Sequence, residues 1–160
     1  MTHDRYLVAL GSNQRHPRHG SPGRVLSAAT GRLSQDWQIE AVAPVTSSAP
    51  VGASQRCYAN GAVLLAGPYS PPAALALLQA VEAEFGRSRR GQRWRARTLD
   101  LDIVLWSGGP WMSEGLTVPH PLFRERPFVL APTAAIAPRW RDPLTGLTLR
   151  QLAFRSRSAP

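Results

Sequence analysis

The sequence predicts an α+β domain with a ferredoxin-like βαββαβ core, and three observations support this fold class. Strand-like and helix-like segments follow one another in the order β-α-β-β-α-β. Both long helical segments begin with the same signal, a Ser-Pro pair. A chain of 160 residues without internal repeats is long enough for one domain with its own core. We therefore expect a single domain over residues 1–160, with an antiparallel sheet, helices packed on it, short C-terminal helices and a frayed tail over about 155–160.

The strands are predicted from short apolar or alternating segments. These cover Tyr6–Leu10, Trp37–Val45 and Cys57–Ala66, and the fourth strand lies within Arg97–Trp106. A turn is expected at Gly11–Asn13, directly after the first strand.

The helices are predicted from their start signals and from apolar residues at helical spacing. Ser21-Pro22 begins the first helix, and Ser70-Pro71 begins the second, which Gly86 ends. The inward faces consist of Val25, Leu26, Ala29 and Leu33 in the first helix and Leu75, Leu78, Val81 and Phe85 in the second. Beyond the fourth strand we expect a short strand and one or two short helices, followed by an amphipathic turn or two within Leu147–Phe154.

Two long irregular segments, Val45–Arg56 and Arg87–Ala96, are expected to be binding loops that close over one site, because long loops in compact domains are usually functional. The second carries much of the positive charge. The formal net charge is +9, all 19 basic residues are arginines, and six of these lie within residues 87–97. Such a cluster binds an anion or stays solvated, and nucleic acid and a polyphosphate are the two anions that suit it.

Composition also bounds the location of the chain. One cysteine, Cys57, excludes an internal disulfide and fits a reducing compartment. The first residues lack the pattern of a signal peptide, and no apolar run is long enough to span a bilayer. We therefore expect a cytoplasmic protein with no membrane partner.

The fourth strand carries two carboxylates, Asp100 and Asp102, on one face, because strand side chains alternate. The apolar residues Leu99, Leu101, Ile103 and Leu105 are expected on the other face. Two carboxylates about 6–7 Å apart repel by about 2–3 kcal/mol, and Asp is disfavoured in strands. Mg²⁺ bound through these oxygens and substrate phosphates would explain the pair. A solvent-facing edge strand is the alternative.

Other candidates are single residues with two readings each. Arg87 and Arg97 stand at the edges of the arginine-rich loop and suit phosphate binding, and Trp94 either stacks on a base or packs on the core. His120, between two prolines, either donates to a phosphate or is structural. Asn60, in an apolar strand, needs a backbone partner or a ligand with a mixed hydrogen-bonding edge. Tyr58 shares its face, and Phe128 is either the opposing ring or part of the core.

The segments "YLVALGSN", "YANGAV", "RWRARTLDLDIVLW" and "LTVPHPLFRERPFVLAP" together resemble the 6-hydroxymethyl-7,8-dihydropterin pyrophosphokinase family of folate biosynthesis. The resemblance covers most of the chain in the order typical of the family. It implies a ferredoxin-like fold and transfer of the diphosphoryl group of ATP to the pterin hydroxymethyl oxygen, with release of AMP. It also implies Asp100 and Asp102 as ligands of two Mg²⁺ ions, and Arg87 and Arg97 as catalytic arginines.

The resemblance further implies two sets of substrate-binding residues. The ATP-binding set is Gln79, Glu82, Arg89, Trp94, Arg97, Ile103, Thr117, His120 and Arg126. The pterin-binding set is Ser48, Pro50, Val51, Tyr58, Asn60, Trp94 and Phe128. No nucleic-acid partner is expected, and we expect a monomer.

Two alternative functions remain open from the residues alone. A small RNA-binding domain would use the arginines on phosphates and Trp94 for stacking, but it leaves the paired aspartates unexplained. A nucleotidyltransferase would use the aspartates on two metals, but it would release pyrophosphate instead of AMP.

Overall fold

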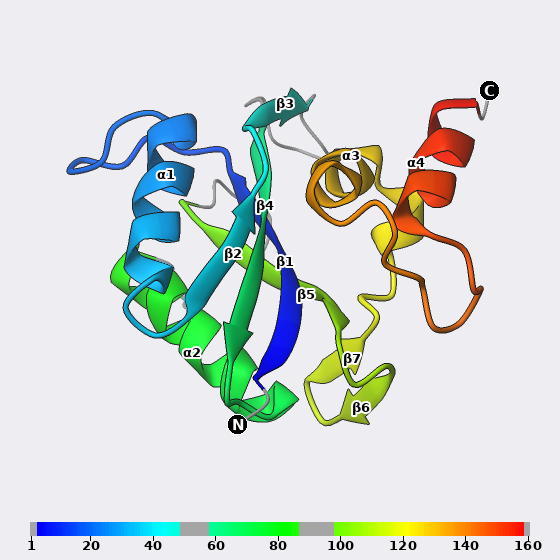
Figure 1. The fold of residues 1–160 in the computed structure, drawn as a ribbon. Coiled ribbons are helices and arrows are strands. Elements are labelled where there is room, and N and C mark those ends of the chain that lie inside the picture. Colours follow the sequence, from blue (N-terminus) through cyan, green and yellow to red (C-terminus); the bar gives the residue numbers. More distant parts are fainter. Residues whose placement is uncertain (1–2, 49–57, 87–97, 159–160) are drawn as a thin grey trace.

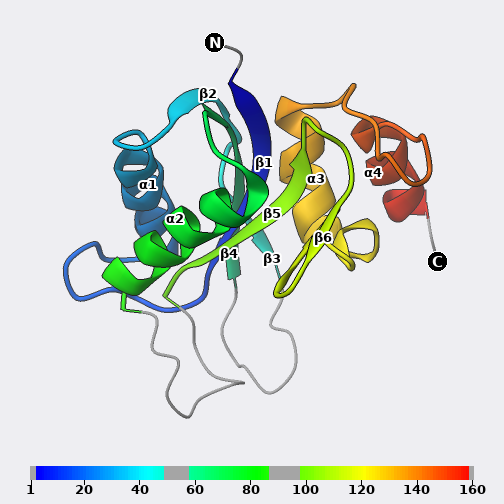
Figure 2. The same cartoon turned by 90° about the horizontal axis from the view of Figure 1, so that it is seen from below.

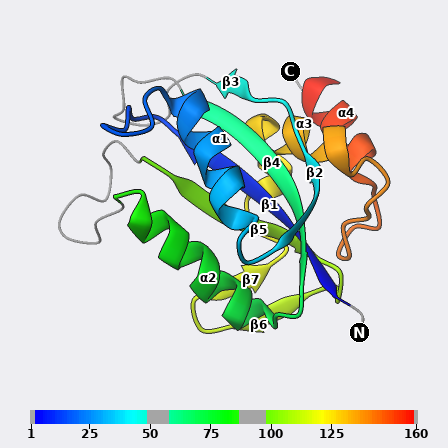
Figure 3. The same ribbon diagram turned by 60° about the vertical axis from the view of Figure 1, so that its left-hand side comes forward.

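The computed structural model describes residues 3–48, 58–86 and 98–158. Its main sheet has five strands in the order β2-β4-β1-β5, with β3 also paired to β4, and all of the pairs are antiparallel. Figure 3 shows β4, β1 and β5 side by side. The strands are β1 (Asp4–Ser12), β2 (Gln38–Val42), β3 (Thr46–Ser48), β4 (Tyr58–Gly67) and β5 (Asp100–Trp106). With β1, β2, β4 and β5 as core strands, this order confirms the ferredoxin-like fold.

Helices cover both faces of the sheet (Figures 1 and 2). On one face lie α1 (Pro22–Leu33) and α2 (Pro71–Glu84), and on the other lie α3 (Pro127–Ile136) and α4 (Leu149–Ser158). Between β5 and α3 the chain forms a hairpin of β6 (Trp111–Ser113) and β7 (Leu116–Val118), and then the short 3₁₀ helix η1 (Phe123–Glu125). Among the described residues, none of the helices combines the length and the apolar character needed to cross a bilayer.

The predicted starts of both long helices are confirmed. Ser21 and Ser70 occupy the N-cap positions with extended backbone, and proline follows at the first helical position in each case. Neither serine side chain makes a capping hydrogen bond, so the fixed φ of proline is the feature that favours these starts. Gly86 follows α2 with a φ of +92°, a conformation in which glycine alone is unstrained.

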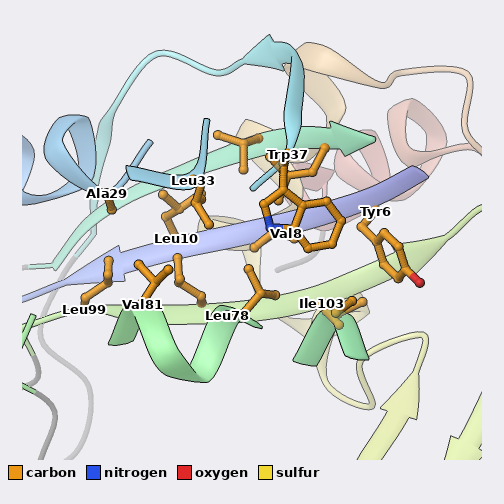
Figure 4. Packing of buried hydrophobic residues seen from close by; sticks show 14 of the residues in the cluster. Tyr6, Val8, Leu10, Ala29, Leu33, Trp37, Leu78, Val81, Leu99 and Ile103 are labelled. Atoms are coloured by element: carbon orange, nitrogen blue, oxygen red, sulfur yellow. The ribbon is translucent and has the colours of Figure 1, made fainter. Parts of the chain in front are cut away.

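The larger core lies between the sheet and the helices α1 and α2 (Figure 4). Alternate residues of β1 point into it and meet apolar residues of both helices, such as Leu33 and Leu78. The remaining residues of β1 point into a second core, which α3, α4 and η1 cover. Burial of each Leu or Val side chain contributes about 1.5–3 kcal/mol. Because β1 is buried on both faces, its sequence reads as a continuous apolar run.

Several elements differ from the prediction, and the second strand, β2, ends at Val42 instead of Val45. The first strand continues to Ser12 through the expected turn, because Gly11 pairs with β4 on one side and with β5 on the other. Strand β3 lies in a segment expected to be loop, since its Thr and Ser residues lack the apolar alternation of a buried strand. Helix α4 extends to Ser158, so residues 155–158 are helical where a frayed tail is expected.

The face assigned to Leu105 is wrong. The pairing of β1 with β5 shifts register between Leu7 and Val8, whose partners are Leu105 and Ile103. Val104 is therefore the extra residue of a β-bulge, and alternation is broken there. Leu105 and Val104 both pack in the second core, whereas Leu99, Leu101 and Ile103 pack in the first, as predicted.

Candidate active site

A cavity of about 430 Å³ lies between the main sheet and the segment that leads from η1 into α3. It brings together seven of the residues that the sequence analysis singles out. These are Ser48, Tyr58, Asn60, Asp100, Asp102, Arg126 and Phe128. The remaining lining residues are Ala9, Leu10, Gly11, Leu122, Glu125 and Val129. Residues from six elements of the fold thus converge on one space, although they lie as far apart in the sequence as Ala9 and Val129.

The register of three neighbouring strands decides which residues form the wall of the cavity on the sheet side. Gly11 of β1 is paired with Asn60 of β4 on one side and with Asp100 of β5 on the other. Since neighbouring strands lie about 4.8 Å apart, the backbones that carry the amide and the carboxylate are separated by about 10 Å. Glycine adds no side chain between them. A flat ligand of a few rings can therefore lie along this row, with an amide at one end and a carboxylate at the other.

Both aspartates face the cavity. Asp100 is half-buried, whereas Asp102, paired with Ala9, is exposed. Within the described ranges, no group of three or more His, Cys, Asp or Glu residues could hold a metal ion by itself. The two carboxylates therefore supply hard oxygen donors but leave most of a coordination shell to water and ligand. This donor set fits Mg²⁺, which usually takes one or two carboxylates and substrate phosphates.

The polar pocket on the β4 side centres on Asn60, which is 4% exposed. Its Nδ2 donates a hydrogen bond to Ser48 Oγ at 2.8 Å. The sequence predicts a backbone partner or a ligand for this amide, whereas in the structure the amide donates to a side chain of β3. Tyr58, the neighbour of Ser48 in the ladder, places its half-buried ring beside the same pocket.

The opposite wall comes from η1 and the start of α3. Arg126 is the N-cap residue of α3, and its guanidinium carbon lies 5.8 Å from the centre of the Phe128 ring. Leu122 and Glu125, which the sequence analysis did not identify, line the same wall. Both residues stand next to Arg126 in the segment "PLFRER". Which of these side chains face the cavity depends on the 3₁₀ turn, which the sequence does not predict.

His120 lies beside this wall and is held in place by two hydrogen bonds. Its backbone N–H donates to the carbonyl of Val104 at 3.1 Å, and its Nδ1 accepts the backbone N–H of Leu122 at 3.2 Å. Burial lowers the pKa of His120, Asp102 acts to raise it, and the positive charge of Arg126 lowers it further. Since Nδ1 accepts, the neutral ring carries its proton on Nε2 and can donate only from there.

Four other predicted ATP-binding residues lie outside the cavity lining. Gln79 on α2 and Thr117 on β7 are exposed. Ile103 is 4% exposed and packs in the larger core. Glu82 is 5% exposed, and its Oε2 accepts the backbone N–H of Leu101 at 2.8 Å. Leu101 lies between the two aspartates, so Glu82 fixes the start of β5 against α2.

The remaining predicted site residues lie outside the described ranges. These are Pro50, Val51, Arg87, Arg89, Trp94 and Arg97.

Comparison with known proteins identifies the family of the chain. Residues 7–138 match the family described as 7,8-dihydro-6-hydroxymethylpterin-pyrophosphokinase (HPPK). The chain is 41% identical over 142 residues to a 2-amino-4-hydroxy-6-hydroxymethyldihydropteridine pyrophosphokinase of Pseudomonas aeruginosa, covering 87% of this chain and 84% of that protein. It is 39% identical over 138 residues to the Synechocystis protein of the same name, covering 83% of this chain and 70% of that one.

Solved structures share the fold. The HPPK-DHPS protein of Plasmodium falciparum, crystallised with pteroate, superimposes with a TM-score of 0.78 at 10% identity. The superposition covers 98% of this chain and 45% of that one, so this chain spans less than half of the two-part protein. The sequence match over residues 7–138, the two relatives and the shared architecture show that the chain belongs to the hydroxymethyldihydropterin pyrophosphokinase family.

Proposed function

We propose that this chain transfers the diphosphoryl group of ATP to the hydroxymethyl oxygen of 6-hydroxymethyl-7,8-dihydropterin, and that the cavity described above holds both reacting groups. The observation that carries the proposal is the row of Asn60, Gly11 and Asp100 across three strands. This row brings an amide, which suits the edge of a flat heterocycle, and a carboxylate pair, which suits a divalent cation, to two ends of one space. In the reaction, a bond forms between the pterin oxygen and the β-phosphorus, and the bond from that phosphorus to the α-phosphate oxygen breaks.

The pterin binds at the β4 side in this proposal. Tyr58 and Phe128 offer ring faces from opposite walls, and Asn60 and Ser48 offer donors and acceptors for the ring edge. Pro50 and Val51 are proposed to complete the pocket, because they directly follow β3 in sequence and the family resemblance implies them. A flat ring held between two side-chain rings presents its hydroxymethyl group to the aspartate end.

The triphosphate binds at the β5 side. Asp100 and Asp102 would hold two Mg²⁺ ions, which would neutralise phosphate charge and stabilise both the attacking and the leaving oxygens. Arg126 lines the cavity, and His120 interacts electrostatically with Asp102; the guanidinium and the Nε2–H of the neutral ring both suit phosphate oxygens. Arg87 and Arg97 are proposed as catalytic arginines that bind the phosphates, as the family resemblance implies. The resemblance also implies the nucleotide contacts Gln79, Glu82, Arg89, Trp94, Ile103 and Thr117.

The products distinguish this proposal from its rivals. With MgATP and the reduced pterin alcohol, we expect AMP and pterin diphosphate in equal amounts, separated by ion-exchange chromatography. ADP as the product would contradict diphosphoryl transfer, and pyrophosphate would indicate the nucleotidyltransferase. An RNA-binding domain would give no turnover and would bind RNA with an affinity that falls steeply with salt.

Asn60→Ala is expected to raise the dissociation constant for the pterin by about tenfold or more, because a buried hydrogen-bonding site is worth about 1–3 kcal/mol. The dissociation constant for MgATP should change less than twofold, since the triphosphate lies at the other end of the cavity. Isothermal titration calorimetry measures both constants. Ser48→Ala is a second test: it removes the partner of Asn60 but keeps the amide, and it should also weaken pterin binding more than MgATP binding, because Ser48 is proposed to contact the ring edge. Equal losses for both substrates would show that Asn60 is structural.

A monomer and a cytoplasmic location remain predictions of the sequence analysis.

A further inference from the structure

A buried ion pair joins η1 to the segment between α3 and α4. Asp142 is fully buried, and its two carboxylate oxygens accept hydrogen bonds from Nε and Nη2 of Arg124 at 2.5 and 2.6 Å. The pairing is bidentate, the strongest geometry that arginine and a carboxylate form. The guanidinium of Arg124 also lies 4.6 Å from the centre of the buried Phe123 ring. Neither Arg124 nor Asp142 lines the cavity, and the family match ends at residue 138, before Asp142.

Asp142 is the fixed end of this pair. Its carboxylate also accepts the hydroxyl of Thr145 at 2.7 Å and the backbone N–H of Leu144 at 3.1 Å. Backbone hydrogen bonds close the same loop: Asp142 N–H donates to Leu147, and Gly146 N–H donates to Asp142, both at 2.8 Å. The loop then leads into α4, whose Leu149 is buried in the second core. Movement of Asp142 would therefore require opening this loop.

Arg124 is the end that meets the cavity wall. Leu122 and Glu125, which both line the cavity, flank it within the same turn, and the N–H of Glu125 donates to the carbonyl of Leu122 at 3.1 Å. The N–H of Arg126 donates to the carbonyl of Phe123 at 3.3 Å. The carbonyl of Arg126 in turn accepts the N–H groups of Val129 and Leu130 in α3. A displacement of Arg124 would thus move the three lining residues around it together.

We infer that the Arg124–Asp142 ion pair positions the η1–α3 wall of the cavity, so that the C-terminal loop over residues 140–149, although remote from the reacting groups, sets how tightly the pterin is held. This inference rests on the proposed function for the identity of the ligand. The two residues are positioning residues. They act through Leu122, Glu125, Arg126 and, one helical turn further, Phe128. None of the residues of this loop lines the cavity.

The test is Arg124→Gln, with Arg32→Gln as the matched control. Arg32 makes a bidentate ion pair with Glu84 at 2.8 and 2.9 Å between α1 and α2, on the face of the sheet away from the cavity wall. Both variants lose one guanidinium and one bidentate pair. Both are measured well below their unfolding temperatures by hydrogen exchange of the amides of residues 122–130, by pterin titration and by steady-state kinetics. Arg124→Lys, which keeps the charge, replaces Arg124→Gln if that variant does not fold.

We expect Arg124→Gln to speed exchange of the Glu125 and Arg126 amides at least tenfold and to raise KM and Kd for the pterin about tenfold. Its kcat should change less than threefold, because the carboxylates of β5 are untouched. Arg32→Gln should leave all of these values within twofold of wild type. The inference is overturned if Arg124→Gln also stays within twofold, or if Arg32→Gln gives the same changes. Failure of the wild-type protein to form AMP would overturn the proposed function instead, while the exchange measurement would still decide whether the ion pair holds the wall.

Discussion

Asp100→Asn and Asp102→Asn are each expected to lower kcat at least about a thousandfold, which corresponds to about 4 kcal/mol of transition-state stabilisation. Asparagine keeps the size of the side chain but removes the negative charge that would hold a divalent cation beside the phosphates. Because Asp102 is exposed and Asp100 half-buried at the cavity, the fold should be retained in both variants. Single-turnover quench measurements of AMP formation at saturating MgATP give the rate of the chemical step.

The control for this prediction is Glu114→Gln. Glu114 is an exposed carboxylate in the turn between β6 and β7, so its replacement makes the same change of charge away from the cavity. Its kcat should match wild type. Circular dichroism and thermal unfolding should show the same folded state in all variants. A turnover within tenfold of wild type for Asp100→Asn or Asp102→Asn would mean that the replaced carboxylate holds no catalytic metal ion.

Much of the fold could be predicted because local chemistry and tertiary packing favour the same structure. The Ser-Pro starts and the glycine after α2 act through backbone dihedral angles, which depend on a few adjacent residues. The alternation around Asp100 and Asp102 placed both carboxylates on one face, and this is observed. Alternation failed at Leu105 because a bulge depends on pairing with β1, and a single strand gives no signal of its partner's register.

Of the candidate site, the sequence predicts only the residues whose polar or charged side chains stand out among apolar neighbours. A buried amide and two aspartates in apolar strands stand out in a sequence, whereas Leu122 is an ordinary apolar residue. Glu82 is a residue whose surroundings could not be predicted from the sequence. The nucleotide contact that the family resemblance implies for Glu82 stays a prediction, and the structure adds that the side chain is buried and accepts a backbone N–H of β5. Burial of that carboxylate depends on how α2 docks against β5, which no local pattern contains.

The hydrogen bond from the Leu101 N–H to Glu82 supports β5 at the point where the strand carries two neighbouring aspartates. The Leu101 N–H that Glu82 accepts lies between the aspartates in sequence, so the backbone of the strand is held from the α2 face while both aspartates point to the other. Their repulsion is then a property of the folded state, which a bound cation would relieve. A strand held only by its ladder could instead twist to separate the charges. Rigid support from the core is thus compatible with the proposed metal site.

The largest stability effect is expected at Asp142. Burial would raise the pKa of this carboxyl, but the hydrogen bonds from Arg124, Thr145 and the Leu144 N–H outweigh burial and lower the pKa to about 2. A carboxyl whose pKa is lower in the folded than in the unfolded chain stabilises the fold at all pH values above its ordinary pKa. The stabilisation is lost as the pH falls toward the folded pKa. Asp142→Asn should therefore lower the free energy of unfolding at pH 7 by about 3 kcal/mol, since it leaves Arg124 without its buried partner.

The pH dependence separates this ion pair from general effects of the substitution. Between pH 7 and about pH 4 the difference in unfolding free energy between wild type and Asp142→Asn should be constant, and between about pH 4 and pH 2 it should shrink by about 2 kcal/mol as the wild-type carboxylate takes up its proton. Urea unfolding at a series of pH values measures this difference directly. Glu114→Gln, at an exposed carboxylate, should match wild type within about 0.5 kcal/mol throughout. A difference that stays constant down to pH 2 would contradict this expectation. It would show that Asp142 stabilises the loop through its hydrogen bonds with Thr145 and Leu144, and that the ion pair between Asp142 and Arg124 contributes little.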